Sequence, residues 1–482
     1  MTRRLSAATL QGLPQAVRRP RYDRGKVEAG IVHVGPGAFH RVHQAWYAEQ
    51  WLATDPRWGI AAVSMRSADL RAALLPQDWL YALAIVDEPA SCEVLGSLCE
   101  VIVASEHLEQ ALARAASPEA RLLTLTVTEK GYCLDVDRRL DLAHPDVAHD
   151  VQHRAQPRSA VGFVVESLRL RRERGLPALT VISCDNLAGN GRLLAAAAQR
   201  LAQQTDASLA AWIECEVPFP CTMVDSITPA TTPELKARVL AATGLEDAWP
   251  VQREAFAQWV VEQHEARESP DWEAAGVIVT DDVAGYECAK LRLLNGAHST
   301  LAYAGLLRGH ATVGEAMQDV ALVEFVRRLL LDDVAPTLPR VRGLEIGDYV
   351  QSLLRRFRNP VIRHELAQIA WDGSKKLPVR ILGTVRDALA AGRSLDQLSV
   401  PLAAWMHFVR RRVAAGVPLI DPLSEQLNQL VRAQADGSAA TDVEAFLALG
   451  TVFPRDLAAA APFRAALEKA YARLGSPGVP LT

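Results

Sequence analysis

The stretch "GIVHVGPGAFHRVHQAWYAEQWLA", residues 30–53, contains the clearest change of hydrophobic period in the chain. Its first part, "GIVHVG" (30–35), is a short apolar run bounded by glycine, which is typical of a buried β-strand. From residue 39 onward the apolar side chains follow helical spacing instead. The stretch therefore predicts a strand followed by a helix, with the glycine-rich turn "VGPGAFH" (34–40) between them.

Gly35 and Gly37 lie in that turn, where the absence of side chains lets the backbone approach a pyrophosphate at the start of a helix. The pattern is the dinucleotide fingerprint G-x-G-x-x-G with His40 in place of the third glycine. A tight turn without any ligand also favours glycine, so the motif alone leaves both readings open. Its position between a strand and a helix favours the dinucleotide.

Three further apolar runs, each ending in polar or glycine-rich residues, alternate with helical stretches: "WGIAAVSM" (58–65), "LLTLTVTE" (122–129) and "ALTVISCD" (178–185). Strands that are separated by helices predict a parallel sheet. Ligands of such sheets bind outside the carboxyl ends of the strands, which is where residues 128–131 and 185–186 fall.

The residues after the second strand bear on the choice of dinucleotide. Asp69 is placed to bind the adenosine ribose of NAD, whereas Arg66 and Ser67 are suited to a 2′-phosphate. The choice between NAD and NADP therefore stays open.

Beyond about residue 285 the chain changes to long amphipathic segments, at 290–308, 313–331, 345–357, 378–391, 400–415, 423–434 and 455–474. A chain of 482 residues also exceeds what one hydrophobic core usually organises. We expect two domains. Residues 1–285 would form an α/β dinucleotide-binding domain, and residues 286–482 a mostly helical substrate and catalytic domain.

Composition narrows the class of partner. The formal net charge is -4 and the arginines are spread among acids, which argues against a nucleic-acid partner. No apolar run is long enough to cross a bilayer. Seven irregularly spaced cysteines without a C-x-x-C pair indicate reduced thiols in a cytoplasm, and no zinc-binding motif is present. We expect a cytoplasmic protein with a small-molecule partner.

A second stretch, "KLRLLNGAHS" (290–299), places a lysine, an asparagine and a histidine close together. In an α-helix, His298 lies about 80° and Asn295 about 140° around the axis from Lys290. All three side chains can then line one wall of a cleft. The alternative is a solvated lysine, an exposed asparagine and a core histidine.

Six motifs occur in a fixed order: "GPGAFHRVHQA", "TVTEKGYCLD", "SCDNLAGNG", "FPCTMVDSITP", "DDVAGYECAKLRLLNGAHS" and "QIAWDGSKKLP". Together they resemble the polyol-specific long-chain dehydrogenases, also called the mannitol dehydrogenase family, over nearly the whole chain. The resemblance implies an α/β fold with a Rossmann-type N-terminal domain and its parallel sheet. It also implies a mostly α-helical C-terminal domain, a nicotinamide cofactor and catalysis without a metal.

The resemblance also implies the site residues. The family's K-x-x-x-x-N-x-x-H signature falls on Lys290, Asn295 and His298, and its active-site asparagine falls on Asn186. The expected dinucleotide-binding residues are Gly35, Gly37, Phe39, Arg66, Asp69, Glu129 and Lys130, and the expected substrate-binding residues are Asp225, Lys376 and Arg380. NAD is the expected cofactor, with NADP as the alternative, in a monomer or small homo-oligomer.

Elementary chemistry explains such a set. A free lysine has a pKa of about 10.4, and burial beside apolar Leu291 and Leu294 near a positive nicotinamide lowers it, which makes Lys290 a usable base. Asn295 and Asn186 can donate hydrogen bonds to an oxygen that gains alkoxide character. His298 would orient the substrate or the lysine.

For the substrate we expect a mannitol-like polyol that is oxidised to its 2-ketose, because polyols are the broader default of the family. The alternative is the D-mannonate and D-fructuronate pair, since Lys376 and Arg380 are suited to a carboxylate.

Two rival interpretations of the chain are weaker. Tyr286 and Lys290 match the Y-x-x-x-K pair of short-chain dehydrogenases, but Tyr22 and Lys26 match it too, before the first strand. A nucleotide-binding protein without turnover is the other rival, and the combined presence of the four expected catalytic residues argues against it.

Overall fold

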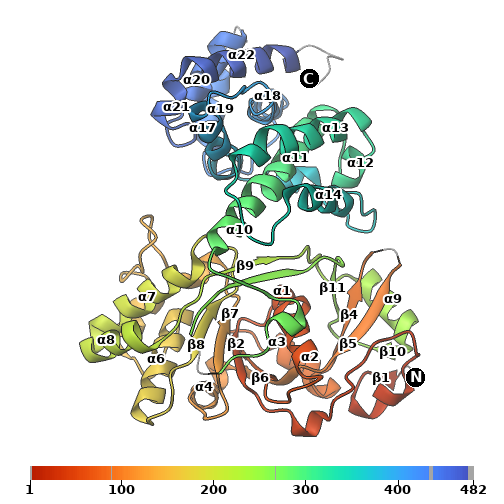
Figure 1. The fold of residues 1–482 in the computed structure, drawn as a ribbon, viewed down its shortest axis with the longest axis vertical. Helices are drawn as coiled ribbons and strands as arrows, with labels where there is room; N and C mark the ends of the chain where they lie inside the picture. Colours follow the sequence, from red (N-terminus) through yellow and green to blue (C-terminus); the bar gives the residue numbers. More distant parts are fainter. Residues whose placement is uncertain (1–2, 88, 266–267, 434–437, 476–482) are drawn as a thin grey trace. The chain divides into compact units, whose positions relative to one another are not determined.

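The computed structural model describes residues 3–87, 89–265, 268–433 and 438–475. The chain divides into two compact units, Met1–Ala284 and Gly285–Thr482, each of which is described by itself (Figure 1). Within the described ranges, every helix is too short or too polar to cross a bilayer.

A five-stranded parallel sheet with the order β6-β3-β2-β7-β8 forms the centre of the first unit. Its strands are β2 (Ile31–Val34), β3 (Ile60–Ser64), β6 (Leu98–Val103), β7 (Leu122–Leu125) and β8 (Thr180–Ser183). The chain runs outward from β2 to one edge and then returns to the other side, so the strand order reverses between β2 and β7. That reversal is the point at which such sheets bind ligands. The predicted α/β class and parallel sheet are confirmed.

Side chains that alternate along the strands pack into two hydrophobic cores. Val32 and Val34 of β2 belong to the core that contains residues of α4, α6, α7 and α8, whereas Ile31 belongs to the core that contains residues of α2. The helices of this unit are α1 (Ala38–Val42), α2 (Gln44–Trp51), α3 (Asp69–Leu74), α4 (Ala104–Ala115), α5 (Pro145–Gln152), α6 (Ala160–Glu173), α7 (Asn190–Thr205), α8 (Ala207–Glu216) and α9 (Pro233–Thr243). Both faces of the central sheet are therefore covered, as a parallel sheet requires.

Smaller sheets complete the first unit, and the sequence analysis had not predicted them. One has the order β11-β4-β5, another has the order β13-β12-β9, and β1 pairs with β10. The strands are β1 (Arg3–Arg4), β4 (Tyr81–Ile85), β5 (Ser91–Leu95), β9 (Thr222–Asp225), β10 (Leu245–Glu246), β11 (Val251–Arg253), β12 (Gln258–Glu262) and β13 (Ile278–Thr280).

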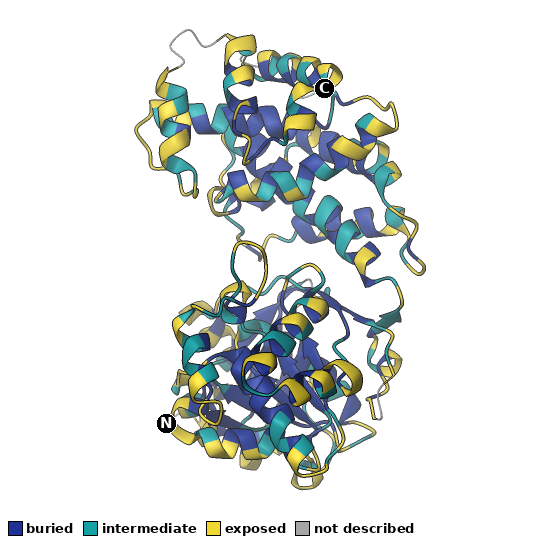
Figure 2. Ribbon diagram, turned by 90° about the vertical axis from the view of Figure 1, so that its left-hand side faces the viewer, coloured by how far each residue is buried: buried dark blue, intermediate teal, exposed yellow. Residues whose placement is uncertain are grey.

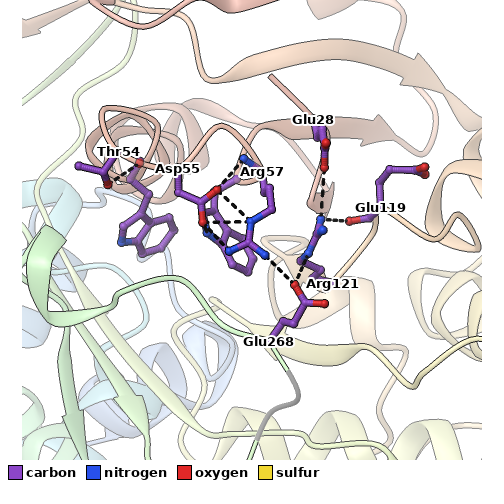
Figure 3. Close-up of polar contacts among 9 residues, drawn as sticks. Glu28, Thr54, Asp55, Arg57, Glu119, Arg121 and Glu268 are labelled. Carbon is purple, nitrogen blue, oxygen red and sulfur yellow. Dashed lines mark hydrogen bonds and ion pairs between the residues drawn. The ribbon is translucent and has the colours of Figure 1, made fainter. Parts of the chain in front are cut away.

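An ion-pair network lies at the amino ends of the central strands (Figure 3). Arg57, just before β3, pairs with Asp55 at 2.8 Å and with Glu268 at 3.1 Å. Arg121, just before β7, pairs with the same Glu268 at 2.7 Å, and both arginines lie over the ring of Trp58. Because these groups occupy the edge opposite to the carboxyl ends, they brace the sheet and do not contribute charge to a ligand site there.

The second unit is helical, as predicted. Its central helix α11 (Gly296–Leu307) is buried from Gly296 to Gly305 and packs against α13, α15 and α18. The other helices are α10 (Val283–Ala289), which begins just before the division, α12 (Val313–Ala316), α13 (Val320–Arg328), α14 (Ile346–Phe357), α15 (Leu366–Ile369), α16 (Gly373–Leu377), α17 (Gly383–Ala390), α18 (Val400–Ala414), α19 (Ser424–Ala433), α20 (Ala439–Leu447), α21 (Arg455–Ala459) and α22 (Ala461–Gly475). Figure 2 shows buried residues inside this helical unit as well as on the sheet of the first unit.

Among the described residues of the second unit, three segments are π-helical: Lys290–Asn295, Leu329–Val334 and Pro378–Leu382. The first packs against both of the others. Short π-helical turns interrupt α-helices mainly at functional sites. Their clustering around Lys290 marks this part of the helical unit for closer inspection.

Candidate active site

A cavity of about 920 Å³ lies at the carboxyl ends of β2, β3 and β7, within the first unit. Its walls include the glycine turn after β2, residues 64–67 at the end of β3, and residues 126–128 and 130–131 after β7. Of the residues that the sequence predicts for a dinucleotide, Gly35, Gly37, Arg66 and Lys130 line this cavity. A cavity of this size suits a large ligand.

The two glycines of the turn are required for different reasons. Gly35 has φ +87°, and a Cβ there would lie 2.4 Å from the carbonyl oxygen of Thr126, so the fold itself requires glycine. Gly37, which precedes α1, has no such constraint, because the nearest protein atom to a Cβ would be 3.9 Å away. Since Gly37 lines the cavity, its missing side chain leaves room for a ligand.

Two buried histidines, His33 and His40, lie next to the glycine turn. His33 of β2 shares hydrogen bonds with the hydroxyls of Thr124 at 2.8 Å and Thr126 at 2.9 Å, and Thr126 donates to the carbonyl of Gly35 at 2.7 Å. The ring of His40 stacks on that of His33. Burial lowers the pKa of His33 to about 3 and that of His40 well below its ordinary value, so both rings are neutral. The sequence analysis did not identify His33, because one histidine in an apolar strand forms no pattern.

The wall after β3 carries a charged pair. The guanidinium of Arg66 donates to the carboxylate of Asp146 at 2.7 Å, and both residues line the cavity. Asp69, at the start of α3, does not line it, and its carboxylate instead accepts a hydrogen bond from the hydroxyl of Ser67 at 2.8 Å. Of the groups expected near the ribose, Arg66 and Ser67 thus lie at the cavity and Asp69 lies behind Ser67.

Other predicted residues of the first unit lie outside the lining. The ring of Phe39 stacks on His43, with centroids 5.0 Å apart, and Glu129 is exposed in the turn Glu129–Tyr132. Asn186 is exposed two residues after Cys184 at the end of β8. Asp225 is the last residue of β9 and is buried opposite Gln258.

In the second unit, Lys290 and Asn295 are the first and last residues of a π-helical segment. The α-helical geometry that we assumed for these residues is therefore wrong. Hydrogen bonds in a π-helix run from residue i to i+5, so residues five apart lie roughly one turn apart on the same side. Lys290, only 9% exposed, and Asn295 consequently share one side of the helix more closely than an α-helix would allow.

His298 is enclosed two residues into α11. Its ring contacts Phe357 and His364, at centroid distances of 4.6 and 5.5 Å, and its Nε2 has no hydrogen-bond partner. Burial holds the pKa of His298 well below its ordinary value, and the nearby positive charges of Arg380 and Arg356 act in the same direction. The ring is therefore a neutral group with one nitrogen left for a ligand.

The predicted substrate-binding cations lie close to this segment. Arg380, in the π-helical segment Pro378–Leu382, donates to the hydroxyl of Ser299 at 3.1 Å and reaches the carbonyl of Asn295 at 3.5 Å. Lys376 donates to the carbonyl of Ile369 at 3.1 Å, and burial, together with Arg380, lowers its pKa. The second unit thus gathers Lys290, Asn295, His298 and Arg380, while Asn186 and Asp225 belong to the first unit.

The family model described as the mannitol dehydrogenase Rossmann domain matches residues 29–274, and that of the mannitol dehydrogenase C-terminal domain matches residues 282–475. The chain belongs to the mannitol dehydrogenase family. The resemblance seen in the six motifs is thereby confirmed, as is the Rossmann character of the first unit. The metal-free expectation stays a prediction, although no group of three or more potential metal ligands occurs among the residues that the structure describes.

Members of the mannitol dehydrogenase family align with nearly the whole chain. D-mannonate oxidoreductase of Escherichia coli (strain K12) is 40% identical over 95% of this chain and 96% of its own length. The ternary complex of Pseudomonas fluorescens mannitol 2-dehydrogenase with NAD and D-mannitol is 35% identical, with a TM-score of 0.81 over 98% of this chain and 97% of that one. A substrate-free D-sorbitol dehydrogenase is 32% identical, with a TM-score of 0.90 over 99% of each chain.

Proposed function

We propose that this member of the mannitol dehydrogenase family is an NAD-dependent dehydrogenase. It would interconvert a secondary alcohol and a ketone on an acyclic polyhydroxylated substrate, with Lys290 as general base. The observation that carries the proposal is the buried Lys290, with Asn295 one π-helical turn away and the unpartnered Nε2 of His298 following on α11. A lysine that is kept from solvent in this way suits proton transfer.

The cavity of the first unit suits a dinucleotide. Gly37 leaves space for the backbone to approach a diphosphate, and Arg41 supplies a buried positive charge on the same cavity wall. Burial lowers the pKa of Arg41 to about 10, which still leaves it cationic at neutral pH. Its Nη1 donates to the carbonyl of Trp249 at 2.7 Å, and its Nε has no partner. NAD, when bound, supplies the acceptor for hydride.

The chain's own residues would handle the proton and the developing charge. The amine of the buried Lys290, in its neutral form, would accept the proton of the substrate hydroxyl. The amide of Asn295 can donate a hydrogen bond to the same oxygen as it becomes negative, and Asn186 is proposed for the same role. The neutral ring of His298 would hold a neighbouring hydroxyl through its Nε2.

The charges around His298 favour a sugar acid over a neutral polyol as substrate. Arg380 and Arg356 are positive groups near His298, and Lys376 lies near Arg380 and near the carboxylates of Asp372 and Asp421. A substrate carboxylate would pair with the guanidinium of Arg380, whereas the hydroxyls of a polyol would bring it no opposite charge. The 40% identity with a D-mannonate oxidoreductase supports the same choice. We therefore place D-mannonate and D-fructuronate first, and mannitol and its 2-ketose second.

The direct test is NADH formation, followed by absorbance, with D-mannonate, D-mannitol and D-sorbitol as separate substrates. Turnover of at least one of them supports the dehydrogenase proposal, and the ranking decides between the two substrate classes. A folded protein that binds NAD but turns over none of the acids or polyols of this series would contradict the proposal.

A further inference from the structure

Asp185 is a buried carboxylate that lies two residues after the end of β8. Its side chain accepts three hydrogen bonds, all from the segment that follows β7. Oδ1 accepts from the backbone N–H of Thr128 at 2.8 Å, and Oδ2 accepts from the N–H of Val127 at 3.0 Å and the hydroxyl of Tyr132 at 2.8 Å. One residue just after β8 thus holds three groups of the neighbouring segment.

The segment that Asp185 holds forms a wall of the dinucleotide cavity. Val127, Thr128, Lys130 and Gly131 all line it. Gly131 packs directly over Val127, since a Cβ on this glycine would lie 2.8 Å from that side chain. The shape of this wall therefore depends on a tight turn of the backbone.

Thr128 sits in that turn with an unfavourable backbone conformation. Its φ is 65° and its ψ is 167°, a region that essentially only glycine occupies without strain. Such a conformation persists only where the surrounding contacts hold it. Asp185 accepts hydrogen bonds from the N–H groups of the strained residue Thr128 and of its neighbour Val127, and the carbonyl of Thr128 accepts a further bond from the N–H of Gly131 at 3.0 Å.

We propose that Asp185 is a positioning residue that holds residues 127–131 in the strained shape that the NAD site requires. Because Asn186 follows directly in the chain, the same bonds fix the start of the loop that carries the proposed catalytic amide. This second part rests on the proposed function. Asp185 itself touches neither NAD nor substrate in the proposal.

An amide at position 185 cannot accept both backbone hydrogen bonds in the same way. The two consecutive N–H groups bond to different oxygens of Asp185, and a carboxylate offers both. An asparagine has one oxygen and one NH₂ group, so its nitrogen would face a backbone donor. Asp185→Asn therefore keeps the size of the side chain but breaks at least one of the two backbone bonds.

The experiment compares NAD affinity, measured by calorimetric titration, with thermal stability in four variants. Asp185→Asn is expected to raise the Kd for NAD by about tenfold or more. Adding Thr128→Gly to it is expected to recover most of that loss, because glycine adopts this conformation without help. Thr128→Gly alone provides the reference for the double variant: Asp185→Asn is expected to raise the Kd for NAD much less in that background than in the parent chain.

Asp442→Asn is the matched control. Asp442 is likewise buried, and its Oδ2 also accepts from a tyrosine hydroxyl, that of Tyr471 at 2.7 Å, but it lies in α20 of the second unit, far along the chain from the cavity residues. This variant is expected to lower the Tm without changing the Kd for NAD. A purely structural role for Asp185 would make the two aspartate variants behave alike, and that result would overturn the proposal.

If Asp185→Asn does not fold, two other variants still test the proposal. The double variant with Thr128→Gly removes the strain, and Tyr132→Phe removes one of the three bonds while keeping both backbone N–H bonds. Tyr132→Phe is expected to raise the Kd for NAD two- to threefold, and an unchanged Kd contradicts the proposal. The kcat of Asn186→Ala tests the proposed function separately from the role of Asp185. A kcat equal to that of the parent chain would refute the catalytic role of Asn186 but would leave the effect of Asp185 on NAD binding intact.

Discussion

The imidazole of His40 lies flat on that of His33, with ring centroids 3.4 Å apart and an interplanar angle of 14°. His40 belongs to α1 and His33 to β2, so the stack joins the two elements that flank the glycine turn. The dinucleotide fingerprint usually has its third glycine at the position of His40, where it allows the helix to approach the strand. Here two flat rings achieve a close approach without glycine, which explains why the incomplete fingerprint still forms a dinucleotide-type turn.

This stack predicts a loss of stability in mild acid. Burial lowers the pKa of both rings, that of His33 to about 3, whereas an unfolded histidine titrates near its ordinary value of about 6.5. The unfolded state therefore binds more protons as the pH falls below about 6.5, and the free energy of unfolding decreases. Each histidine contributes at most about 1.4 kcal/mol per pH unit in this range. Denaturant titrations between pH 8 and pH 5 measure the slope.

His40→Phe is expected to reduce that slope, because phenylalanine can stack but cannot titrate. Other buried histidines, among them His298, contribute to the total, so the difference between variant and parent is the informative quantity. His107→Asn serves as the control for replacing a histidine, since His107 is half exposed. An equal slope in parent and His40→Phe would show that the stack does not carry the acid sensitivity.

Removal of the amine of Lys290 is expected to abolish turnover and to spare the cofactor. Lys290→Ala should lower kcat by about 10²- to 10⁴-fold, because the substrate hydroxyl loses its proton acceptor. NAD binding, measured by titration, should stay within about twofold of the parent, since the dinucleotide residues are in the first unit. Lys236→Ala, at an exposed helical lysine, is the control. Normal kcat in Lys290→Ala would remove the general base from the proposal.

The two asparagines should behave differently from the lysine. Asn295→Ala and Asn186→Ala are each expected to lower kcat by about 10²-fold or more, as the loss of a donor to a developing oxyanion does. The Kd for NAD should change little in Asn295→Ala. Single-turnover measurements of hydride transfer are the suitable readout, because they isolate the chemical step. A variant whose only change is a higher KM would show that its asparagine binds substrate uniformly and does not stabilise the transition state.

The sequence predicted the central sheet where strands are mostly apolar, as in Ile31–Val34, but it missed β6. That strand, Leu98–Val103, is at the edge of the sheet and includes Cys99 and Glu100, which are only partly buried, so its pattern is diluted. The π-helical turn at Lys290 was also missed. Its leucine-rich residues suit an α-helix equally well, and the wider turn depends on packing against two other π-helical segments.

Contacts between distant residues explain the remaining omissions at the site. Asp185 was placed correctly at the carboxyl end of a strand, yet its bonds join it to residues 57 and 58 positions away in the chain. Likewise, the pairing of Arg66 with Asp146 spans 80 residues. No local pattern encodes such partners, whereas glycine turns and strand ends are visible locally.

The Arg66 and Asp146 pair predicts a preference for NAD over NADP. A 2′-phosphate would have to compete with the carboxylate that already holds the guanidinium at 2.7 Å. Asp146→Asn is expected to raise the ratio of kcat/KM for NADP to that for NAD by about tenfold, because Arg66 becomes available to the phosphate. Asp146→Asn combined with Arg66→Ala should return the ratio to the parent value. A ratio that does not move in the single variant would exclude Arg66 from the choice of cofactor.

The substrate class depends most directly on Arg380. If this guanidinium pairs with the carboxylate of a sugar acid, the parent chain should prefer D-mannonate over D-mannitol by about a hundredfold in kcat/KM. That ratio corresponds to about 2.7 kcal/mol of differential transition-state binding. Arg380→Ala should remove the preference, mainly by slowing the reaction of the acid, and Arg380→Lys should retain part of it, because an ammonium keeps the charge without the planar fork.

Arg380 also contacts Ser299 and the carbonyl of Asn295, so its loss is expected to disturb both substrates to some extent. The ratio of the two kcat/KM values cancels that common effect. Ser299→Ala supplies the matched control, because it removes the same 3.1 Å hydrogen bond but leaves the positive charge in place, and the preference should persist. Two results would contradict the pairing of Arg380 with a substrate carboxylate: a parent chain that favours D-mannitol, or a preference for D-mannonate that survives Arg380→Ala. The first result would also make the neutral polyol the favoured substrate class.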